Sequence, residues 1–123
     1  MKDKREPAKS FRDLIVWQRT HELVLGVYQE TKNFPKEELY SLTSQIRRSS
    51  TSVSANIAEG FKKKSDKDKI RILNIAQGSL SETECFLILA RDLGYGDMKI
   101  LMAKADEVGR LLEAYMKAIK GKK

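Results

Sequence analysis

Apolar residues recur at helical spacing in four segments of the chain, and no segment alternates in the manner of a strand. The clearest stripe, at steps of three and four, consists of Leu42, Ile46, Ser49, Val53 and Ile57. The other positions of that segment are mostly small, among them Ser50, Thr51, Ser52, Ser54, Ala55 and Ala58. A helix of this composition cannot fill space with bulk, so the pattern predicts close packing against a neighbouring helix.

The first helix is expected to begin near Ser10, whose hydroxyl forms a capping signature with Asp13, and to end near Asn33. Its predicted core positions are Leu14, Trp17, His21, Val24 and Tyr28. A short helical turn is expected after Pro35 and leads into the second helix. That helix is predicted to end at Glu59, with Gly60 as its C-cap.

The third helix is predicted to start at a second capping signature, Ser65 with Asp68, and to end at Gly94. Its apolar positions are Ile70, Leu73, Ala76, Leu80, Leu87 and Ala90. Gly78 interrupts its interior at a cost of roughly 1 kcal/mol relative to Ala, which predicts a close approach to the small face of the second helix. The fourth helix, capped by Asp97, has the stripe Leu101, Ala105, Val108, Leu112, Tyr115 and Ile119.

Four amphipathic helices joined by short connections predict an all-α fold, an antiparallel up-down-up-down four-helix bundle. A chain of 123 residues is the size of one domain. We therefore expect a single domain over residues 1–123, with residues 1–10 and 120–123 as flexible basic tails.

The chain has a net charge of +7, which favours an anionic partner, and nucleic acid, RNA or DNA, comes first. The bundle topology brings the N-terminal arm, the connection between the second and third helices and the C-terminus to one end. Residues 60–71 carry six basic and two acidic side chains. The predicted phosphate contacts are Lys62, Lys63, Lys64, Lys67, Lys69 and Arg71. The alternative is that these lysines only keep a loop and two tails solvated.

Two adjacent arginines, Arg47 and Arg48, form a second binding candidate on the second helix. Neighbouring helical residues point about 100° apart, so the two cannot both face one partner squarely. We expect one to pair with Glu82 or Glu84 across the bundle and the other to face a partner chain or nucleic acid. The alternative is two ordinary surface or ion-paired arginines.

Residues for catalysis or for holding a metal or cofactor are sparse, so neither a cofactor nor a metal is expected. His21 is expected to be a packing residue and Cys85 a small apolar filler. One histidine cannot supply the paired Glu-x-x-His motifs of a di-metal bundle. The single cysteine excludes an internal disulfide framework.

Three glutamates, Glu59, Glu82 and Glu84, could in principle pair as acid and base. With no evident pocket, hydrogen bonding between helices is the better interpretation, and Asn56 with Glu59 is expected to bond to the third helix or to loop backbone. We therefore predict that the chain is not an enzyme. No apolar run is long enough to span a membrane, and the first residues do not read as a secretory signal, so a cytoplasmic location is expected.

Three strings agree in order and spacing with a known family: LIVWQRTHELVLGVY, FPKEELYSLTSQIRRSSTSVSANIAEGF and ILNIAQGSLSETE. From about Phe11 to Gly96 the chain resembles the bacterial four-helix-bundle proteins encoded in intervening sequences of 23S rRNA genes. It is similar, more distantly, to the accessory variability proteins of diversity-generating retroelements. The matching motif positions are Trp17, Tyr28, Phe34, Pro35, Gln45, Arg47, Arg48, Asn56, Glu59, Gly60, Gly78, Ser79 and Glu82.

The resemblance implies a bundle that assembles as a homopentamer, with a basic surface proposed to contact nucleic acid; the retroelement relatives also bind a reverse transcriptase. One departure is Ser41, where many relatives have Gly. The favoured hypothesis is a non-enzymatic, oligomeric nucleic-acid-binding bundle. The alternative is a protein-interaction adaptor, for example for a reverse transcriptase or a ribosome-associated partner. An enzyme using Glu59 and Glu82 is the third hypothesis.

Overall fold

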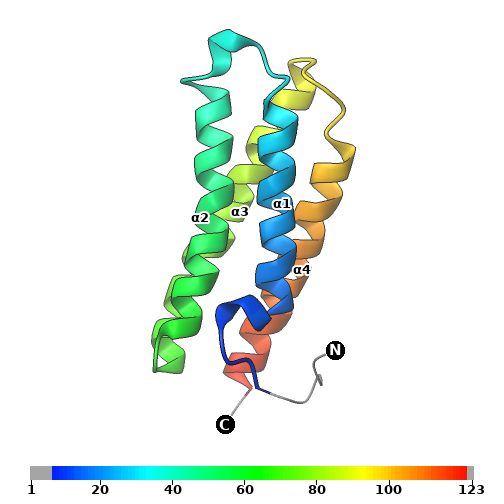
Figure 1. Cartoon of the computed structure of the whole chain (residues 1–123). Helices are drawn as coiled ribbons and strands as arrows, with labels where there is room; N and C mark the ends of the chain where they lie inside the picture. Colours follow the sequence, from blue (N-terminus) through cyan, green and yellow to red (C-terminus); the bar gives the residue numbers. More distant parts are fainter. Residues whose placement is uncertain (1–6, 122–123) are drawn as a thin grey trace.

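The structure is a computed structural model that describes residues 7–121, and helices are the regular secondary structure within that range (Figure 1). The long helices are α1 (Ile15–Thr31), α2 (Leu42–Lys62), α3 (Asp66–Asp92) and α4 (Lys99–Lys120). Two 3₁₀ turns, η1 (Phe11–Asp13) and η2 (Lys36–Glu38), precede α1 and α2. Each long helix runs antiparallel to the next, so the predicted up-down-up-down four-helix bundle is confirmed.

The helices form a closed square in which α1 and α3 each pack against both α2 and α4. The α2–α3 turn, the described start of the chain and the end of α4 lie at one end of the bundle (Figure 1). The α1–α2 and α3–α4 connections lie at the other. This arrangement decides which charged segments are neighbours. None of the helices within residues 7–121 is both long and apolar enough to cross a membrane.

The capping signatures predicted at Ser10 and Ser65 form, whereas the N-cap of α4 is Met98 and not the predicted Asp97. Ser10 and Asp13 make a reciprocal capping box, although it closes η1, and α1 begins only after Leu14. The Ser65 side chain accepts a hydrogen bond from the backbone N–H of Asp68 at 3.1 Å. Gly94 follows α3 with a φ of +83°, the left-handed conformation that glycine adopts without a side-chain penalty.

The core is built from the predicted stripes of three helices. In α2 all five predicted positions, from Leu42 to Ile57, are buried. The α4 stripe is buried as well, except that Tyr115 is only partly covered. Met116, which was not predicted, is also buried. In α3 the core also takes Ile72 and Thr83, and Ile70 packs at its edge.

The predicted core face of α1 is wrong, because the observed buried face is rotated from it by part of a helical turn. His21 and Tyr28 are exposed, Trp17 is half-buried, and the residues that face the core are Val16, Thr20, Leu23, Val24, Val27 and Thr31. Two threonines can be buried because each hydroxyl donates to the carbonyl four residues earlier, at 2.7 Å in both cases. His21 instead stacks on the Trp17 ring at the edge of the bundle, with ring centroids 5.0 Å apart.

The predicted end of α2 is also wrong, because Gly60 is not a cap. The helix continues to Lys62, and Gly60 is buried where Leu73 of α3 crosses it. A Cβ atom at Gly60 would lie 3.1 Å from Leu73 Cδ2, closer than packed side chains normally approach. The glycine therefore allows a close helix crossing immediately before the α2–α3 turn.

Candidate nucleic-acid interface

The α2–α3 turn brings the predicted lysines to one end of the bundle, and we call residues 62–71 with their side chains the basic end. Lys62, Lys64 and Lys67 are exposed, and none of the three has a hydrogen-bond or ion-pair partner among residues 7–121. Their ammonium groups are consequently available to an anion.

The remaining predicted cations of the basic end are already engaged. Lys63 Nζ lies 3.7 Å from Glu59 Oε2, and Arg71 Nε lies 4.0 Å from Asp68 Oδ1. Both pairs are open to solvent and are worth little to stability, so an incoming phosphate can compete with the carboxylates.

Lys69 has a structural role at this end. Its ammonium donates to the carbonyl of Phe61 at 2.6 Å and to that of Gly60 at 3.4 Å, and it lies over the Phe61 ring. It thereby satisfies carbonyls that the end of α2 leaves without intrahelical partners. We therefore do not count Lys69 among the cations available for binding.

Further cations from other elements lie near this end. Lys9 and Arg12 belong to the described N-terminal arm, and Lys117 and Lys120 to the last turns of α4. A cavity of about 360 Å³ joins these elements, since Pro7, Phe61 and Ala118 all line it. The lysines and arginine of residues 1–6 and 122–123 fall outside the described residues, as do most of the predicted tails.

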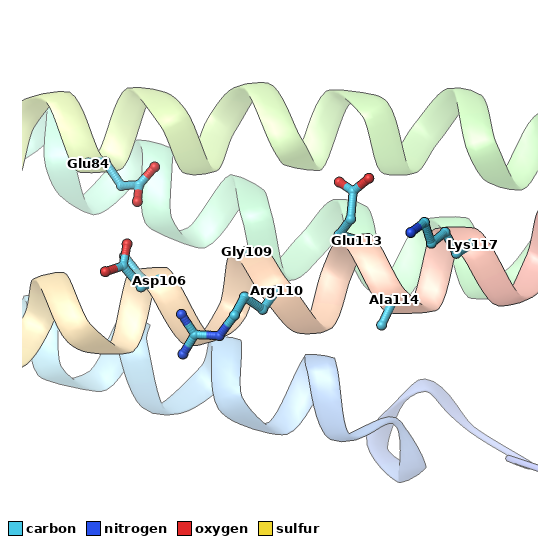
Figure 2. A pocket seen from close by; sticks show the side chains of 8 residues that line it. Glu84, Asp106, Gly109, Arg110, Glu113, Ala114 and Lys117 are labelled. Carbon is cyan, nitrogen blue, oxygen red and sulfur yellow. The ribbon is translucent and has the colours of Figure 1, made fainter.

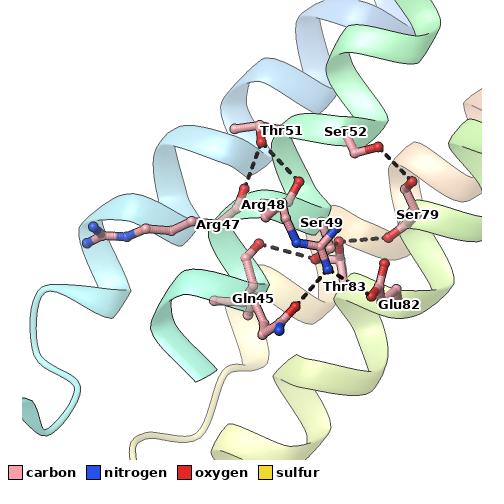
Figure 3. Close-up of polar contacts among 10 residues, drawn as sticks. Gln45, Arg47, Arg48, Ser49, Thr51, Ser52, Ser79, Glu82 and Thr83 are labelled. Carbon is pink, nitrogen blue, oxygen red and sulfur yellow. Dashed lines mark hydrogen bonds and ion pairs between the residues drawn. The ribbon is translucent and has the colours of Figure 1, made fainter. Parts of the chain in front are cut away.

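The two arginines of α2 point in different directions (Figure 3). Arg48 turns toward α3, where its Nη2 donates to Gln45 Oε1 at 2.7 Å and pairs with Glu82 Oε2 at 3.4 Å. Arg47 turns toward α1, where its Nε donates to Thr31 Oγ1 at 2.9 Å. The prediction that one of the two arginines pairs with a glutamate across the bundle is thus confirmed by Arg48 and Glu82.

The small residues of α2 do pack against α3, but not at the predicted glycine. Ser49 and Thr83 share a hydrogen bond of 2.8 Å in the core, and Ser52 and Ser79 share one of 2.9 Å beside it (Figure 3). Gly78 is exposed, and nothing lies within 4 Å of where its Cβ would be. The close approach predicted for Gly78 is therefore wrong, and Gly60 takes that role.

Two other polar predictions are wrong. Asn56 donates to the Ser52 carbonyl at 2.8 Å, and Glu59 pairs with Lys63, so both interactions stay on α2 and the residue that follows it. Cys85 is exposed on the outer face of α3 and fills no space in the core.

A groove between α3 and α4, of about 560 Å³, carries a carboxyl pair that the sequence did not reveal (Figure 2). Glu84 and Asp106 point toward each other from opposite walls. Burial raises the pKa of Glu84 above its ordinary value of 4.5, and the neighbouring Asp106 raises that pKa further. Arg110, Glu113 and Lys117 lie along the α4 wall.

The walls of this groove carry charges of both signs, from Glu84, Asp106, Arg110, Glu113 and Lys117. Glu59 and Glu82, the other acid–base candidates, are each paired with a cation on the surface. No group of three or more metal-ligating side chains occurs in the described part of the chain.

A family profile described as 23S rRNA-intervening sequence protein matches residues 12–114, most of the chain. The chain belongs to this family. A similar solved structure is the crystal structure of a protein with unknown function from the S23 ribosomal protein family of Bacteroides thetaiotaomicron. The two share 29% sequence identity and a TM-score of 0.77, over 84% of this chain and 96% of that chain. No curated protein matches the sequence significantly.

Several residues of the motifs that the chain shares with the intervening-sequence family make structural contacts within the bundle. Gln45, Arg48 and Glu82 form one polar cluster across α2 and α3, and Ser79 belongs to the same interface. These motif residues therefore contribute to the contact between α2 and α3. Arg47 instead turns toward α1, where its Nε donates to Thr31.

Proposed function

We propose that this member of the intervening-sequence family is a non-enzymatic, oligomeric, cytoplasmic protein that binds nucleic acid through the phosphate backbone at its basic end. The observation that carries the proposal is the set of exposed, unpaired ammonium groups of Lys62, Lys64 and Lys67 on one turn. Cations grouped in this way release counterions from a polyanion when they bind it. The family description refers to 23S rRNA, so RNA is the first nucleic acid to test.

A salt titration of a matched pair of variants tests this proposal. In the first variant, Lys62, Lys64 and Lys67 are all replaced by Gln. In the control, Arg91, Lys99 and Lys104, which lie at the opposite end or along α4, are replaced by Gln, so the net charge changes equally. We expect the first variant to lose affinity for duplex RNA and to lower the slope of log K against log salt by about 2 to 3, as loss of three phosphate contacts requires.

The control variant is expected to keep the wild-type slope. Equal losses in both variants would show a response to net charge alone, and no binding by the wild type at low salt would refute the proposal.

The second part of the proposal is self-association through the outer face of α3. Between residues 74 and 89 every exposed position of α3 is uncharged: Asn74, Ile75, Gly78, Ser81, Cys85, Ile88 and Leu89. Ile75, Ile88 and Leu89 are each at least 41% exposed, which is typical of an interaction surface. The same face is where the alternative function, an adaptor for a protein partner, would act.

Light scattering distinguishes these possibilities. We expect a mass several times that of the 14.1 kDa chain, with a homopentamer as the proposed assembly, and we expect Ile75→Glu to reduce that mass. The matched control is Ile15→Glu, on a similarly exposed side chain of α1. A wild-type monomer at micromolar concentration would contradict self-association and would favour the adaptor function for this face.

A further inference from the structure

Arg47 is held in place, yet most of its donors are unused. The guanidinium stacks over the Tyr28 ring at 4.6 Å, and its Nε donates to Thr31 Oγ1 at 2.9 Å. Both Nη atoms lack a hydrogen-bond or ion-pair partner within residues 7–121. The side chain is only partly exposed. Its neighbour Arg48 also uses a single nitrogen, but that Nη2 is paired with the Glu82 carboxylate, whereas Arg47 has no acidic partner within residues 7–121.

Arg47 lines a surface cavity of about 400 Å³, which we call the α1–α2 groove. It is lined by Tyr28, Leu39, Tyr40, Thr43, Ser44, Arg47 and Arg48. A second hollow shares Leu39, Thr43 and Arg47 with it and adds Lys32 and Lys36. The groove is large enough for a small ligand, and Arg47 and Arg48 supply its cations. The α1–α2 connection, which carries Leu39 and Tyr40, lies at the opposite end of the bundle from the α2–α3 turn (Figure 1).

Tyr40 gives the groove an aromatic surface that the fold does not use. Its side chain is 92% exposed, the highest value among the exposed large apolar and aromatic residues. A tyrosine so exposed contributes almost nothing to the core. It can present a ring face to a ligand without any rearrangement.

The turn that carries Tyr40 is firmly anchored. The Glu38 carboxylate accepts hydrogen bonds from Ser41 Oγ at 2.6 Å and from Tyr95 Oη at 2.7 Å, and from the Leu42 backbone at 3.3 Å. The hydrogen bond from Ser41 is the main cause that lowers the pKa of Glu38, followed by the bond from Tyr95. This carboxylate is therefore held by Ser41, Tyr95 and Leu42, and it makes no ion pair with Arg47 within residues 7–121.

We propose that the α1–α2 groove binds an unpaired nucleotide of a single strand, with its phosphate on the Nη atoms of Arg47 and its base stacked on Tyr40. A planar guanidinium with two free nitrogens matches a phosphate in a bidentate manner. An aromatic ring accepts the face of a base only when that base is not stacked within a duplex. This inference rests on the proposed function and adds a preference for single strands to it.

The experiment compares two probes, a labelled single-stranded RNA of about twelve nucleotides, within the length that one domain covers, and the blunt duplex made with its complement. Affinities of the full-length chain are measured by fluorescence anisotropy. We expect Tyr40→Ala to weaken single-strand binding roughly 5- to 100-fold, as loss of one stacked base does, and to leave duplex binding unchanged. Tyr40→Phe, which keeps the ring, should bind both probes as the wild type does.

A second pair of variants tests the phosphate contact. Arg47→Gln should lower the single-strand salt slope by about 0.7, the value for one phosphate, while Arg47→Lys should keep the slope and lose part of the affinity. Circular dichroism establishes that these variants remain folded, because Arg47 also packs on Tyr28. A single strand containing 2-aminopurine adds a direct readout, since its fluorescence is quenched on stacking, and Tyr40→Ala should abolish that quenching.

The possible failures can be told apart. Wild-type binding of both probes that is unaffected by Tyr40→Ala and Arg47→Gln would overturn the groove inference and leave the basic end as the binding surface. No binding of either probe at low salt would overturn both proposals. Equal weakening of single-strand and duplex binding by Tyr40→Ala would show that the ring does not select unpaired bases, and would also overturn the inference.

Discussion

The two sides of α3 are held in different ways. The α2–α3 interface, where α3 packs against α2, is close. Ser49 and Thr83 satisfy each other by a hydrogen bond at its centre, and Gly60 lies beneath Leu73. The contact of α3 with α4, the α3–α4 interface, opens into the groove where Glu84 meets Asp106. Small side chains let the backbones of α2 and α3 approach closely. The α2–α3 pair is therefore the more closely packed half of the bundle.

The largest expected effect comes from replacing one small residue in each of the two interfaces with leucine. Ser49 is fully buried, so Ser49→Leu should cost about 2 to 4 kcal/mol of unfolding free energy, because it overpacks the core and removes the bond to Thr83. Ala114 lines the open groove, and Ala114→Leu should change stability by less than about 0.5 kcal/mol. Denaturant unfolding followed by circular dichroism measures both, and similar losses would show that the two interfaces are packed alike.

A smaller effect is expected from a pair of glycine substitutions. Gly109→Ala, whose Cβ would lie 3.5 Å from Leu80, should stabilise the protein by about 0.5 to 1 kcal/mol through helix propensity. Gly60→Ala has the same propensity gain, but its Cβ would lie 3.1 Å from the fully buried Leu73. We expect it to be at least about 1 kcal/mol less favourable than Gly109→Ala. Thermal unfolding of both variants checks this, and equal stabilisation would contradict the close crossing at Gly60.

The smallest effect concerns the carboxyl pair and depends on pH. Because burial, and then Asp106, raises the pKa of Glu84, the folded state favours the protonated form. Stability is therefore lost as pH rises from the ordinary value of 4.5 through the raised pKa. Glu84→Gln should stabilise the protein at pH 7 by a few tenths of a kcal/mol, about the scale of a solvent-open charge interaction, and the gain should vanish below the ordinary pKa.

The matched control for this prediction is Glu113→Gln, in the same groove but hydrogen-bonded to Gln77. It should show no such gain at pH 7. A pH-independent effect of Glu84→Gln, measured by denaturant unfolding across the acidic range, would contradict the raised pKa of Glu84.

Much of the fold could be predicted from local sequence. The spacing of Leu42, Ile46, Val53 and Ile57 predicted the buried face of α2, and Ser65 predicted the start of α3. These features depend on residues within one or two helical turns. The α1 face was harder to predict, because two overlapping stripes compete there and the buried one includes threonines whose hydroxyls bond to their own helix.

The candidate sites were only partly predictable. The charges of the basic end and the arginine pair are visible in the sequence, and so is the expected partner Glu82. The role of Lys69 as a partner of α2 carbonyls is not, because it depends on where α3 re-enters beside the end of α2. The α1–α2 groove was missed for a similar reason, since Tyr40 carries no pattern that marks it as exposed.

The sequence by itself determined the four helices, their order and the end of the bundle that collects the lysines, because helical periodicity and short connections leave little choice of topology. Tertiary structure alone decided which glycine lies at a helix crossing, which arginine is paired with a carboxylate and which has no acidic partner within residues 7–121. Gly60 and Gly78, like Arg47 and Arg48, differ only in what the neighbouring helix places opposite them. That depends on the rotation of each helix about its axis, which is set by packing over the whole bundle.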